Sequence, residues 1–375
     1  MRPIQMVDLK GQYSRIQGEV DQAIRGVLES TAFINGKPVS DFSSALGKYL
    51  GIGHVIPCAN GTDALQIALM GLGLEPGDEV ITPSFTFIAT TEVVALLRLK
   101  PVFADVDRKT FCIDPGSLEK QITKKTKAIV PVHLYGQSAP MKEIMDLADA
   151  HGLKVIEDNA QAIGGDYIFP DGKSCKTGTI GTAGTTSFFP SKNLGAYGDG
   201  GALFTNDPAL AEVFKMVANH GQSKRYYHEL VGCNSRLDTL QAAILNVKLP
   251  LLDEYINRRR EAADYYDRAF AGHSKIKTPY RASYSRHVFH QYTLILEGAD
   301  RNKLNEFLAA RNIPSMIYYP VPAHRQNMFA SFKSGSQKLE VTDWLTDRVI
   351  SLPMHTELYE EQLSFICNSV LEFLQ

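Results

Sequence analysis

Val155-Ile156-Glu157-Asp158-Asn159-Ala160-Gln161 joins a short apolar run to two acids and a group of small polar residues. The apolar run predicts a buried strand that ends at the acids. Similar apolar runs recur between residues 79 and 205, and segments of helical period separate several of them. We expect strands at Glu79–Thr82, Pro101–Asp105, Ala128–Val132, Lys154–Glu157, Thr185–Phe189 and Gly201–Thr205. Helices are expected at Thr62–Gly73, Ala89–Leu97, Met141–His151 and Pro208–Asn219.

Strands that alternate with helices predict an α/β protein with a mostly parallel central sheet, covered by helices on both faces. In such sheets ligands bind outside the carboxyl ends of the strands. We therefore expect the functional residues in loops that directly follow strands.

The chain changes character after about residue 235. Two long helices are expected at Arg236–Leu249 and Leu252–Phe270, with Pro250 at their junction. Beyond them we expect a strand at His287–Leu296, a helix at Asn302–Arg311, a proline-rich turn at Tyr319–Pro322 and a last helix at Glu360–Phe373. This predicts a large domain over residues 1–249 and a smaller C-terminal α+β domain over residues 250–375.

The composition is that of an ordinary soluble globular protein. The 375 residues are 44% hydrophobic and 21% charged, and the net charge of −2 gives no reason to expect nucleic-acid or electrostatic membrane binding. The first residues lack the apolar run of a signal peptide, and no run approaches the roughly 20 apolar residues that span a bilayer. We therefore expect a cytoplasmic protein.

No metal site or disulfide is expected. The five cysteines are odd in number and far apart in sequence, which is typical of free thiols. His287 and His290 form the closest histidine pair, but residues three apart on a strand face opposite sides.

A phosphate-binding turn is predicted in the segment Cys58–Leu65. The small residues before the helix, Gly61 among them, would present free backbone N–H groups at its positive end, and Thr62 would add a hydroxyl. The same residues also fit an ordinary helix cap. Asp158, at the end of a strand, fits a metal ligand, a base, a partner of a cofactor cation or a turn cap.

Lys192 follows an apolar strand and lies among small and apolar residues in Thr185–Gly195. Most lysines are solvated, but a lysine removed from water has a lowered pKa and becomes a nucleophile suited to a Schiff base. Gly195, Gly198, Gly200 and Gly201 would allow close backbone approach around it.

Together the three segments are typical of a pyridoxal 5′-phosphate site. The phosphate would bind at the Gly61-Thr62 turn with Ser187 as a further donor, Asp158 would keep the ring nitrogen protonated, and Lys192 would bond covalently to the cofactor. Phe85 would either stack on the ring or pack in the core.

These segments resemble the DegT/DnrJ/EryC1/StrS sugar aminotransferases. The matching motifs are Asn60–Leu65, Glu157–Gln161, Ser187–Lys192, Gly198–Gly201 and Asn234–Asp238, and the similarity runs from Val7-Asp8-Leu9 to Ser351-Leu352-Pro353-Met354. The resemblance implies a transferase of fold type I, similar to aspartate aminotransferase, that works as a homodimer with its sites at the interface.

The resemblance also implies a role for each matching residue. Lys192 corresponds to the cofactor lysine, Asp158 to the partner of the ring nitrogen, Gln161 to the group beside the ring hydroxyl and Phe85 to the stacking aromatic. The phosphate contacts are implied to be Gly61, Thr62 and Ser187, with Asn234 from the neighbouring subunit. Asn159 departs from the common alanine. Some relatives replace the lysine with histidine and carry out dehydration, so Lys192 favours transamination.

The implied reaction moves the amino group of L-glutamate, by way of pyridoxamine 5′-phosphate, to a keto-sugar nucleotide. The motifs are similar to those of the branch that aminates C3 of UDP-2-acetamido-2-deoxy-3-oxo-D-glucuronate for bacterial lipopolysaccharide (O-antigen). Two alternatives stay open: an aminotransferase for a 4-keto-sugar nucleotide, and a catalytically inert regulator that binds pyridoxal phosphate.

Candidate substrate residues are Arg236, Tyr318, Tyr319, His324 and His220. Arg236 would pair with a carboxylate or a phosphate, or would serve only the start of its helix. The two tyrosines and His324 flank a proline-rich turn that would return to the site, although ordinary packing also explains them. His220 and the basic, aromatic segment Lys224–His228 would cover the nucleotide or form a solvated loop.

Overall fold

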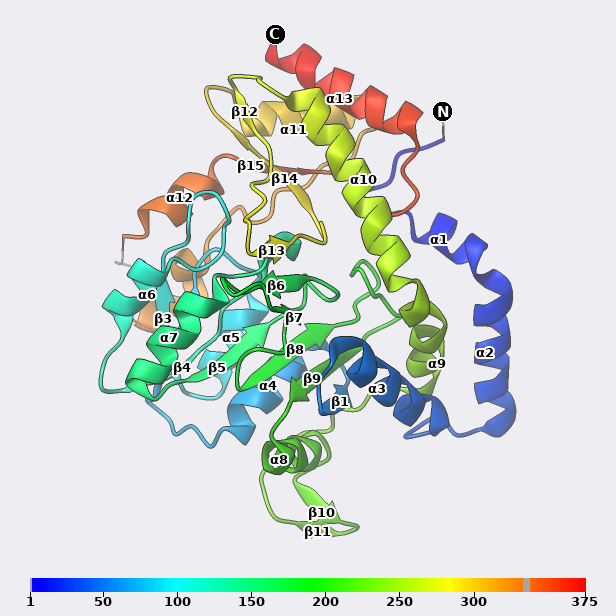
Figure 1. Ribbon diagram of the computed structural model, residues 1–375, viewed down its shortest axis with the longest axis vertical. Coiled ribbons are helices and arrows are strands. Elements are labelled where there is room, and N and C mark those ends of the chain that lie inside the picture. The colour runs from blue at the N-terminus through cyan, green and yellow to red at the C-terminus, as the bar shows by residue number, and fades with distance from the viewer. Residues whose placement is uncertain (1, 333–337) are drawn as a thin grey trace.

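A seven-stranded sheet forms the centre of the protein (Figure 1). The computed structural model describes residues 2–332 and 338–375. The strand order is β1-β9-β8-β5-β4-β2-β3, and neighbours from β3 to β8 are parallel, whereas β9 is antiparallel to both β8 and β1. The strands are β1 (His54–Cys58), β2 (Glu79–Pro83), β3 (Lys100–Ala104), β4 (Thr126–Ile129), β5 (Lys154–Asp158), β8 (Ala183–Ser187) and β9 (Gly201–Thr205). The predicted α/β fold with a mostly parallel sheet is confirmed.

Helices cover both faces of this sheet. One face packs against α4, α5 and α8, and the other packs against α3, α6, α7 and α9, so that apolar side chains of each strand are buried on both sides. The helices are α3 (Lys37–Leu50), α4 (Gly61–Gly71), α5 (Ala89–Leu96), α6 (Pro115–Gln121), α7 (Met141–His151), α8 (Pro208–Ala218) and α9 (Thr239–Lys248). Outside them, α1 (Leu9–Arg15) leads into α2 (Gln17–Ser30), which packs on α9.

A second core lies in the C-terminal part of the chain. The strands β12 (Ile276–Lys277), β14 (Tyr292–Leu296) and β15 (Val349–Leu352) form an antiparallel sheet. Around them lie α10 (Leu252–Phe270), α11 (Arg301–Ala310) and α13 (Glu360–Leu374), while α12 (Glu340–Thr346) packs toward the large sheet. Ile4 joins this second core, so the first residues pack with the C-terminal unit. The domain division at residue 249 stays a prediction.

The α9–α10 pair connects the two cores. A single 3₁₀ turn, Leu249–Leu251, separates the two helices, and α10 runs from beside the large sheet to the C-terminal unit (Figure 1). The remaining short elements are β6 (Asp166–Ile168), β7 (Ser174–Lys176), β10 (Gln222–Lys224), β11 (Tyr227–His228), β13 (Ser285–Arg286) and 3₁₀ turns at Leu134–Gly136, Ala323–Arg325 and Asn327–Phe332.

Two segments depart from the expectations near the cavity described below. The strand expected at His287–Leu296 begins only at Tyr292, and the preceding residues are irregular, with Phe289 at a positive φ of 47°. The helix expected from Arg236 begins at Thr239. Among the described residues, no helix is both long and apolar enough to cross a membrane.

Candidate active site

A cavity of about 630 Å³ opens at the carboxyl ends of β5 and β8. It brings together eight of the residues predicted from the sequence, which come from four separate segments. These are Gly61, Thr62, Asp158, Gln161, Ser187, Lys192, Tyr318 and Tyr319. The position agrees with the rule that ligands bind at the carboxyl edge of such sheets.

Lys192 lies in the loop between the antiparallel neighbours β8 and β9. Backbone hydrogen bonds hold this loop: the Phe188 amide donates to Gly200 O and the Ala196 amide to Phe188 O, both at 2.7 Å, and the Lys192 amide donates to Phe189 O at 2.8 Å. Burial lowers the pKa of Lys192 to about 8, although the charge of Asp158 opposes the shift. About a tenth of the amine is therefore neutral and nucleophilic at pH 7, far more than for a solvated lysine.

Asp158 is the last residue of β5, and its side chain is only 5% exposed. Its Oδ2 accepts a hydrogen bond from the Thr90 hydroxyl at 2.7 Å, and its Oδ1 accepts one from the Ala160 amide at 3.1 Å. These two donors fix the carboxylate at the cavity wall and leave it capacity to accept a further bond.

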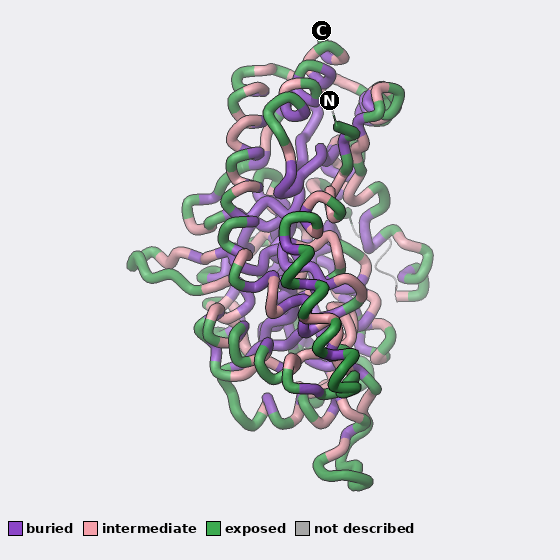
Figure 2. The backbone as a smooth tube through the Cα atoms, turned by 90° about the vertical axis from the view of Figure 1, so that its right-hand side faces the viewer, coloured by how far each residue is buried: buried purple, intermediate pink, exposed green. Residues whose placement is uncertain are grey.

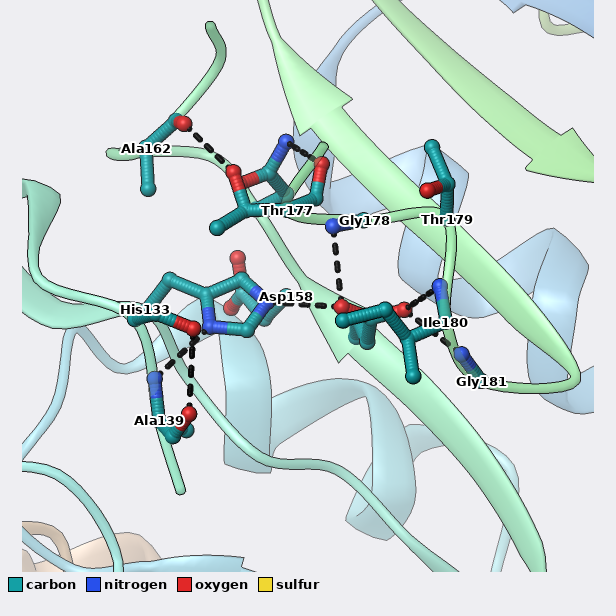
Figure 3. Close-up of polar contacts among 12 residues, drawn as sticks. His133, Ala139, Asp158, Ala162, Thr177, Gly178, Thr179, Ile180 and Gly181 are labelled. Atoms are coloured by element: carbon teal, nitrogen blue, oxygen red, sulfur yellow. Dashed lines mark hydrogen bonds and ion pairs between the residues drawn. The ribbon is translucent and has the colours of Figure 1, made fainter. Parts of the chain in front are cut away.

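Glu157, the other acid of the pair, is fully buried and faces away from the cavity, as alternation along a strand requires. Its carboxylate accepts backbone N–H bonds from Gly178, Ile180 and Gly181 at 2.6–2.9 Å (Figure 3). His133 Nδ1 accepts from the Ala139 amide, so Nε2 carries the proton and donates to Glu157 at 2.9 Å. Glu157 therefore anchors the Gly178–Gly181 turn.

The N-terminal end of α4 forms another part of the cavity wall. Asn60 caps the helix: its side chain accepts from the otherwise free Asp63 amide at 2.8 Å, and its carbonyl accepts the first intrahelical bond, from Ala64. Gly61 and Thr62 line the cavity. A Cβ on Gly61 would lie 2.7 Å from the Ser187 Cβ, so only glycine lets the helix start approach β8 this closely.

Gln161 is hydrogen-bonded to two tyrosines at the cavity. Its Oε1 accepts from the Tyr135 amide at 2.8 Å, and its Nε2 donates to the Tyr319 hydroxyl at 3.0 Å. The Tyr135 hydroxyl in turn donates to the Tyr318 carbonyl. The predicted return of the proline-rich segment to the site thus holds for Tyr318 and Tyr319.

The aromatic segment after β2 differs from the expectation. Phe85 is fully buried and packs against the rings of Phe111, Tyr135 and Tyr319, whereas Phe87 is 53% exposed and lines the cavity. The chain bends after Pro83 instead of continuing as a strand, so the sequence alone could not tell which aromatic faces the cavity. The stacking role predicted for Phe85 is geometrically available to Phe87.

Besides Phe85, four predicted residues lie outside the cavity lining. His324 is buried against the Ser84 hydroxyl, at 2.7 Å from Nδ1, and near Asp343. The other three gather near the end of α8: the His220 amide donates to Cys233 O, Asn234 pairs with Asn219, and Arg236 Nη1 donates to Asn219 Oδ1 at 3.4 Å. Their functional roles stay predictions.

The cavity groups fit pyridoxal phosphate on three counts. A buried carboxylate (Asp158) suits a ring cation, the amine of Lys192 suits an aldehyde, and the helix start at Gly61-Thr62 suits a phosphate. The close approach of Gly61 to Ser187 adds a hydroxyl at the phosphate end. Among the described residues no cluster of metal-ligating side chains occurs.

Residues 14–371 match the DegT/DnrJ/EryC1/StrS aminotransferase family. The chain belongs to this family. Similar proteins include the UDP-2-acetamido-2-deoxy-3-oxo-D-glucuronate aminotransferase of Pseudomonas aeruginosa, which is 45% identical over 97% of this chain and 98% of the relative. A "Pleiotropic regulatory protein" of Geobacillus stearothermophilus is also 45% identical, over 99% of this chain and 98% of its own.

Solved structures of the family agree with this membership. DesV of S. venezuelae has a TM-score of 0.95 at 38% identity, covering 100% of this chain and 99% of its own. NtdA of Bacillus subtilis, solved with bound PMP, has a TM-score of 0.88 at 31% identity, covering 95% and 81%. The chain is thus a sugar aminotransferase of fold type I that depends on pyridoxal phosphate.

In this family member, two groups besides Phe87 escaped the sequence interpretation, one in the cavity lining and one behind it. Thr90 holds Asp158, and it could have been noticed as a hydroxyl within the apolar helix that follows Phe87. Burial, with the charges of Lys192 and Arg259, holds the pKa of His290 well below its ordinary value, so a neutral imidazole lines the cavity. The strand expected at His287–Leu296 does not reveal toward which side the His290 side chain points.

Proposed function

We propose that the protein transfers the amino group of L-glutamate to C3 of UDP-2-acetamido-2-deoxy-3-oxo-D-glucuronate. The observation that carries the proposal is the single cavity that joins Lys192, Asp158 and the Gly61-Thr62 helix start. The choice of sugar rests on the relative from Pseudomonas aeruginosa that acts on this compound and is 45% identical. In this proposal the enzyme is cytoplasmic and supplies lipopolysaccharide (O-antigen) synthesis.

The residues of the cavity divide into holding groups and one proton carrier. Gly61, Thr62 and Ser187 would hold the cofactor phosphate, Asp158 the ring nitrogen, and Gln161 the ring hydroxyl. Phe87, not Phe85, would cover one face of the ring, since it is the aromatic at the cavity surface.

When bound, pyridoxal phosphate supplies an electron-accepting ring that stabilises negative charge on the carbon bearing the amino group. Lys192 is the base, because burial lowers its pKa to about 8 and leaves neutral amine near neutral pH. Its Nζ takes the proton from Cα of glutamate and later returns a proton to the sugar carbon that is aminated. The carboxylate of Asp158, fixed by Thr90 and Ala160, keeps its charge directed into the cavity throughout.

The substrate side of the cavity needs further cations. Glutamate carries two carboxylates and a nucleotide sugar carries a diphosphate, yet among the described lining residues the basic side chains are Lys192 and the neutral His290. Basic residues are plentiful on the exposed β10–β11 hairpin, which projects from the body beyond α8 (Figures 1 and 2). Tyr226, Tyr227 and Val231 on or beside it are exposed.

We therefore propose a homodimer in which this projection reaches the cavity of a second copy. His220, Asn234 and Arg236 lie together at its base, so it would bring His220 and Arg236 to the substrate and Asn234 to the cofactor phosphate. Arg236 suits this role because its Nε is buried without a protein partner in the described chain. Arg236→Lys in both subunits should then lower activity at both sites, whereas mixed dimers of Arg236→Lys subunits with Lys192→Ala subunits should regain one working site.

The test is amination of a panel of keto-sugar nucleotides with glutamate, with the aminated carbon located by NMR. We expect the 3-keto-glucuronate to react with the highest kcat/KM and to carry nitrogen at C3. Preferred amination at C4 would replace the proposed substrate with a 4-keto sugar, as GDP-perosamine synthase of Caulobacter vibrioides, 36% identical, would suggest. No turnover with any sugar or with glutamate would favour the inert regulator, the reading that the name of the Geobacillus relative supports.

A further inference from the structure

Two buried cations lie on one side of the α9–α10 pair. Lys248 is the last residue of α9 and Arg259 belongs to α10, and their side chains are 1% and 2% exposed. Eleven residues, about three helical turns, separate them, which places both on the same side of nearly continuous helix.

Neither cation is explained by an ion pair. Burial, together with the charge of Arg259, lowers the pKa of Lys248 to about 7, and burial lowers that of Arg259 to about 10. No acid among the described residues opposes either shift. Burying a charge without a neighbouring acid lowers the stability of the fold, and an apolar side chain of similar shape would lower it less. A role other than stability is therefore indicated.

Both cations bind backbone carbonyls of loops that line the cavity. Lys248 Nζ donates to the carbonyl of Gly195, three residues after Lys192, and lies 5.1 Å from the ring centre of Tyr197 in the same loop. Arg259 Nη1 lies within 3.2 Å of the Phe289 carbonyl, 3.4 Å of the His290 carbonyl and 2.9 Å of the Met354 carbonyl.

The two loops are also bonded to each other. Asn193 Nδ2 donates to the Val288 carbonyl at 3.0 Å. Both loops are irregular, so their carbonyls cannot be satisfied by a helix or a sheet and need donors from elsewhere. Long cationic side chains from a rigid helix supply such donors at fixed positions.

We propose that Lys248 and Arg259 are positioning residues that hold, from one helix side, the loops carrying Lys192 and His290. The inference rests on the proposed role of Lys192 as the reactive amine. Lys248 fixes the position of the Lys192 loop directly, through the Gly195 carbonyl. Arg259 holds the 287–291 loop, which is bonded in turn to Asn193 of the Lys192 loop. Neither side chain is among the described residues that line the cavity.

The first measurement separates this inference from the proposed function. Wild-type protein is loaded with pyridoxal phosphate, reduced with borohydride and mapped by peptide mass spectrometry. Label on Lys192 supports its role as the cofactor lysine, and label elsewhere removes the proposed function, whatever Lys248 does.

The second measurement uses apoprotein and follows the pKa of Lys192 itself by competitive acetylation from about pH 6 to about pH 11, a range that includes ordinary lysine. Wild type should titrate near its depressed value of about 8. In Lys248→Met the loop is released and Lys192 gains water, so its pKa should rise toward 10.5 and its labelling at pH 8 should fall by up to roughly 100-fold.

Matched variants make the result specific. Lys215→Met removes an exposed lysine that pairs with Glu212 on α8, and it should leave the pKa of Lys192 unchanged. Arg259→Lys should raise that pKa by less than Lys248→Met, because its link runs through Asn193. Lys248→Leu replaces the methionine variant if the latter does not fold.

A residue that only stabilised the fold would lower the melting temperature and leave the pKa of Lys192 where it is. An unchanged pKa in a folded Lys248 variant overturns the role of Lys248, and an unchanged pKa in Arg259→Lys overturns that of Arg259. With the loaded enzyme, Lys248→Met should also lower kcat about 10- to 100-fold, the scale expected for a misplaced catalytic group.

Discussion

Glu157 and Asp158 are neighbours on β5 with the same charge, but they serve different sides of the sheet. Glu157 is fully buried and accepts bonds from three backbone amides and His133. Asp158 faces the cavity and accepts bonds from two protein donors. A carboxylate saturated by the protein stabilises local structure, whereas one with unused acceptor capacity at a cavity is available to a ligand.

The same contrast separates two phenylalanines after β2. Phe85 is enclosed by other aromatic rings, and Phe87 lines the cavity. In each pair, two chemically similar residues lie one or two positions apart, and one of them is in the core while the other faces the cavity. Residue type and spacing therefore identify the segment that carries the site. The contacts that each side chain makes within the protein show which residue of the pair is left free to bind a ligand.

The largest loss of activity is expected for Lys192→Ala, which changes a residue of the cavity. Removing the proton carrier should lower the rate of amino transfer at least about 10²- to 10⁴-fold, the range of general acid–base catalysis. The free energy of unfolding should change little, because burial of the Lys192 amine already disfavours its charged form and only the charge of Asp158 opposes this. Steady-state kinetics and urea unfolding, with Lys215→Ala as control, check both parts.

Exchanging the two acids for amides should separate chemistry from stability. Asp158→Asn should lower kcat about 10²- to 10³-fold by removing an oriented charge from the cavity. Glu157→Gln should cost about 3 kcal/mol of unfolding free energy, because its amide group faces donors that a carboxylate satisfied. Equal loss of stability in both variants, measured by urea denaturation, would break the comparison.

Truncating the two phenylalanines sharpens the same comparison. Phe85→Ala should destabilise the protein by about 3–5 kcal/mol through the cavity left in the core. Phe87→Ala should leave stability nearly unchanged and weaken cofactor binding by about 0.5–1.5 kcal/mol, the scale of an aromatic contact. Thermal unfolding and cofactor titration distinguish them, and a cofactor defect confined to Phe85→Ala would restore the original expectation.

The smallest effect concerns pH. Lys248 has a pKa of about 7 in the folded protein and 10.5 ordinarily, so between these values the unfolded chain binds a proton that the folded chain does not. Stability should therefore rise with pH across this window, by up to about 1.4 kcal/mol per pH unit from this group. Lys248→Met should lose that slope. The interval from pH 7 to 8 isolates Lys248, because Lys192 contributes above about 8.

Urea unfolding at several pH values checks this prediction. The groups that face Lys248 are Arg259 and the ring of Tyr197, and both are retained in the variant. Identical slopes in wild type and variant would mean that Lys248 does not titrate near neutrality.

Much of the region around the seven-stranded sheet could be predicted from the sequence. Met141–His151 and Gly201–Thr205 match the observed elements residue for residue, because strong periodicity and clear end signals bound them. Lys192, Asp158 and the Gly61-Thr62 turn were found because each follows a strand or starts a helix, and topology alone brings such positions together.

The remainder depended on long-range contacts that spacing does not encode. The irregular 287–291 segment, predicted as strand, is held by Arg259 and Asn193 through its carbonyls, and neither partner is near in sequence. The bend after Pro83 decides between Phe85 and Phe87. His324, a plausible cavity residue beside the proline-rich turn, instead hydrogen-bonds Ser84 inside the protein.

The central claim is that the cavity built around Lys192 and Asp158 takes an amino group from glutamate. The most direct measurement is the yield of 2-oxoglutarate when protein loaded with pyridoxal phosphate meets L-glutamate without any sugar. The account predicts about one equivalent per subunit for wild type and none for Lys192→Ala on the same timescale. Absence of 2-oxoglutarate from wild type with its cofactor bound, or equal yields from the two proteins, would contradict it.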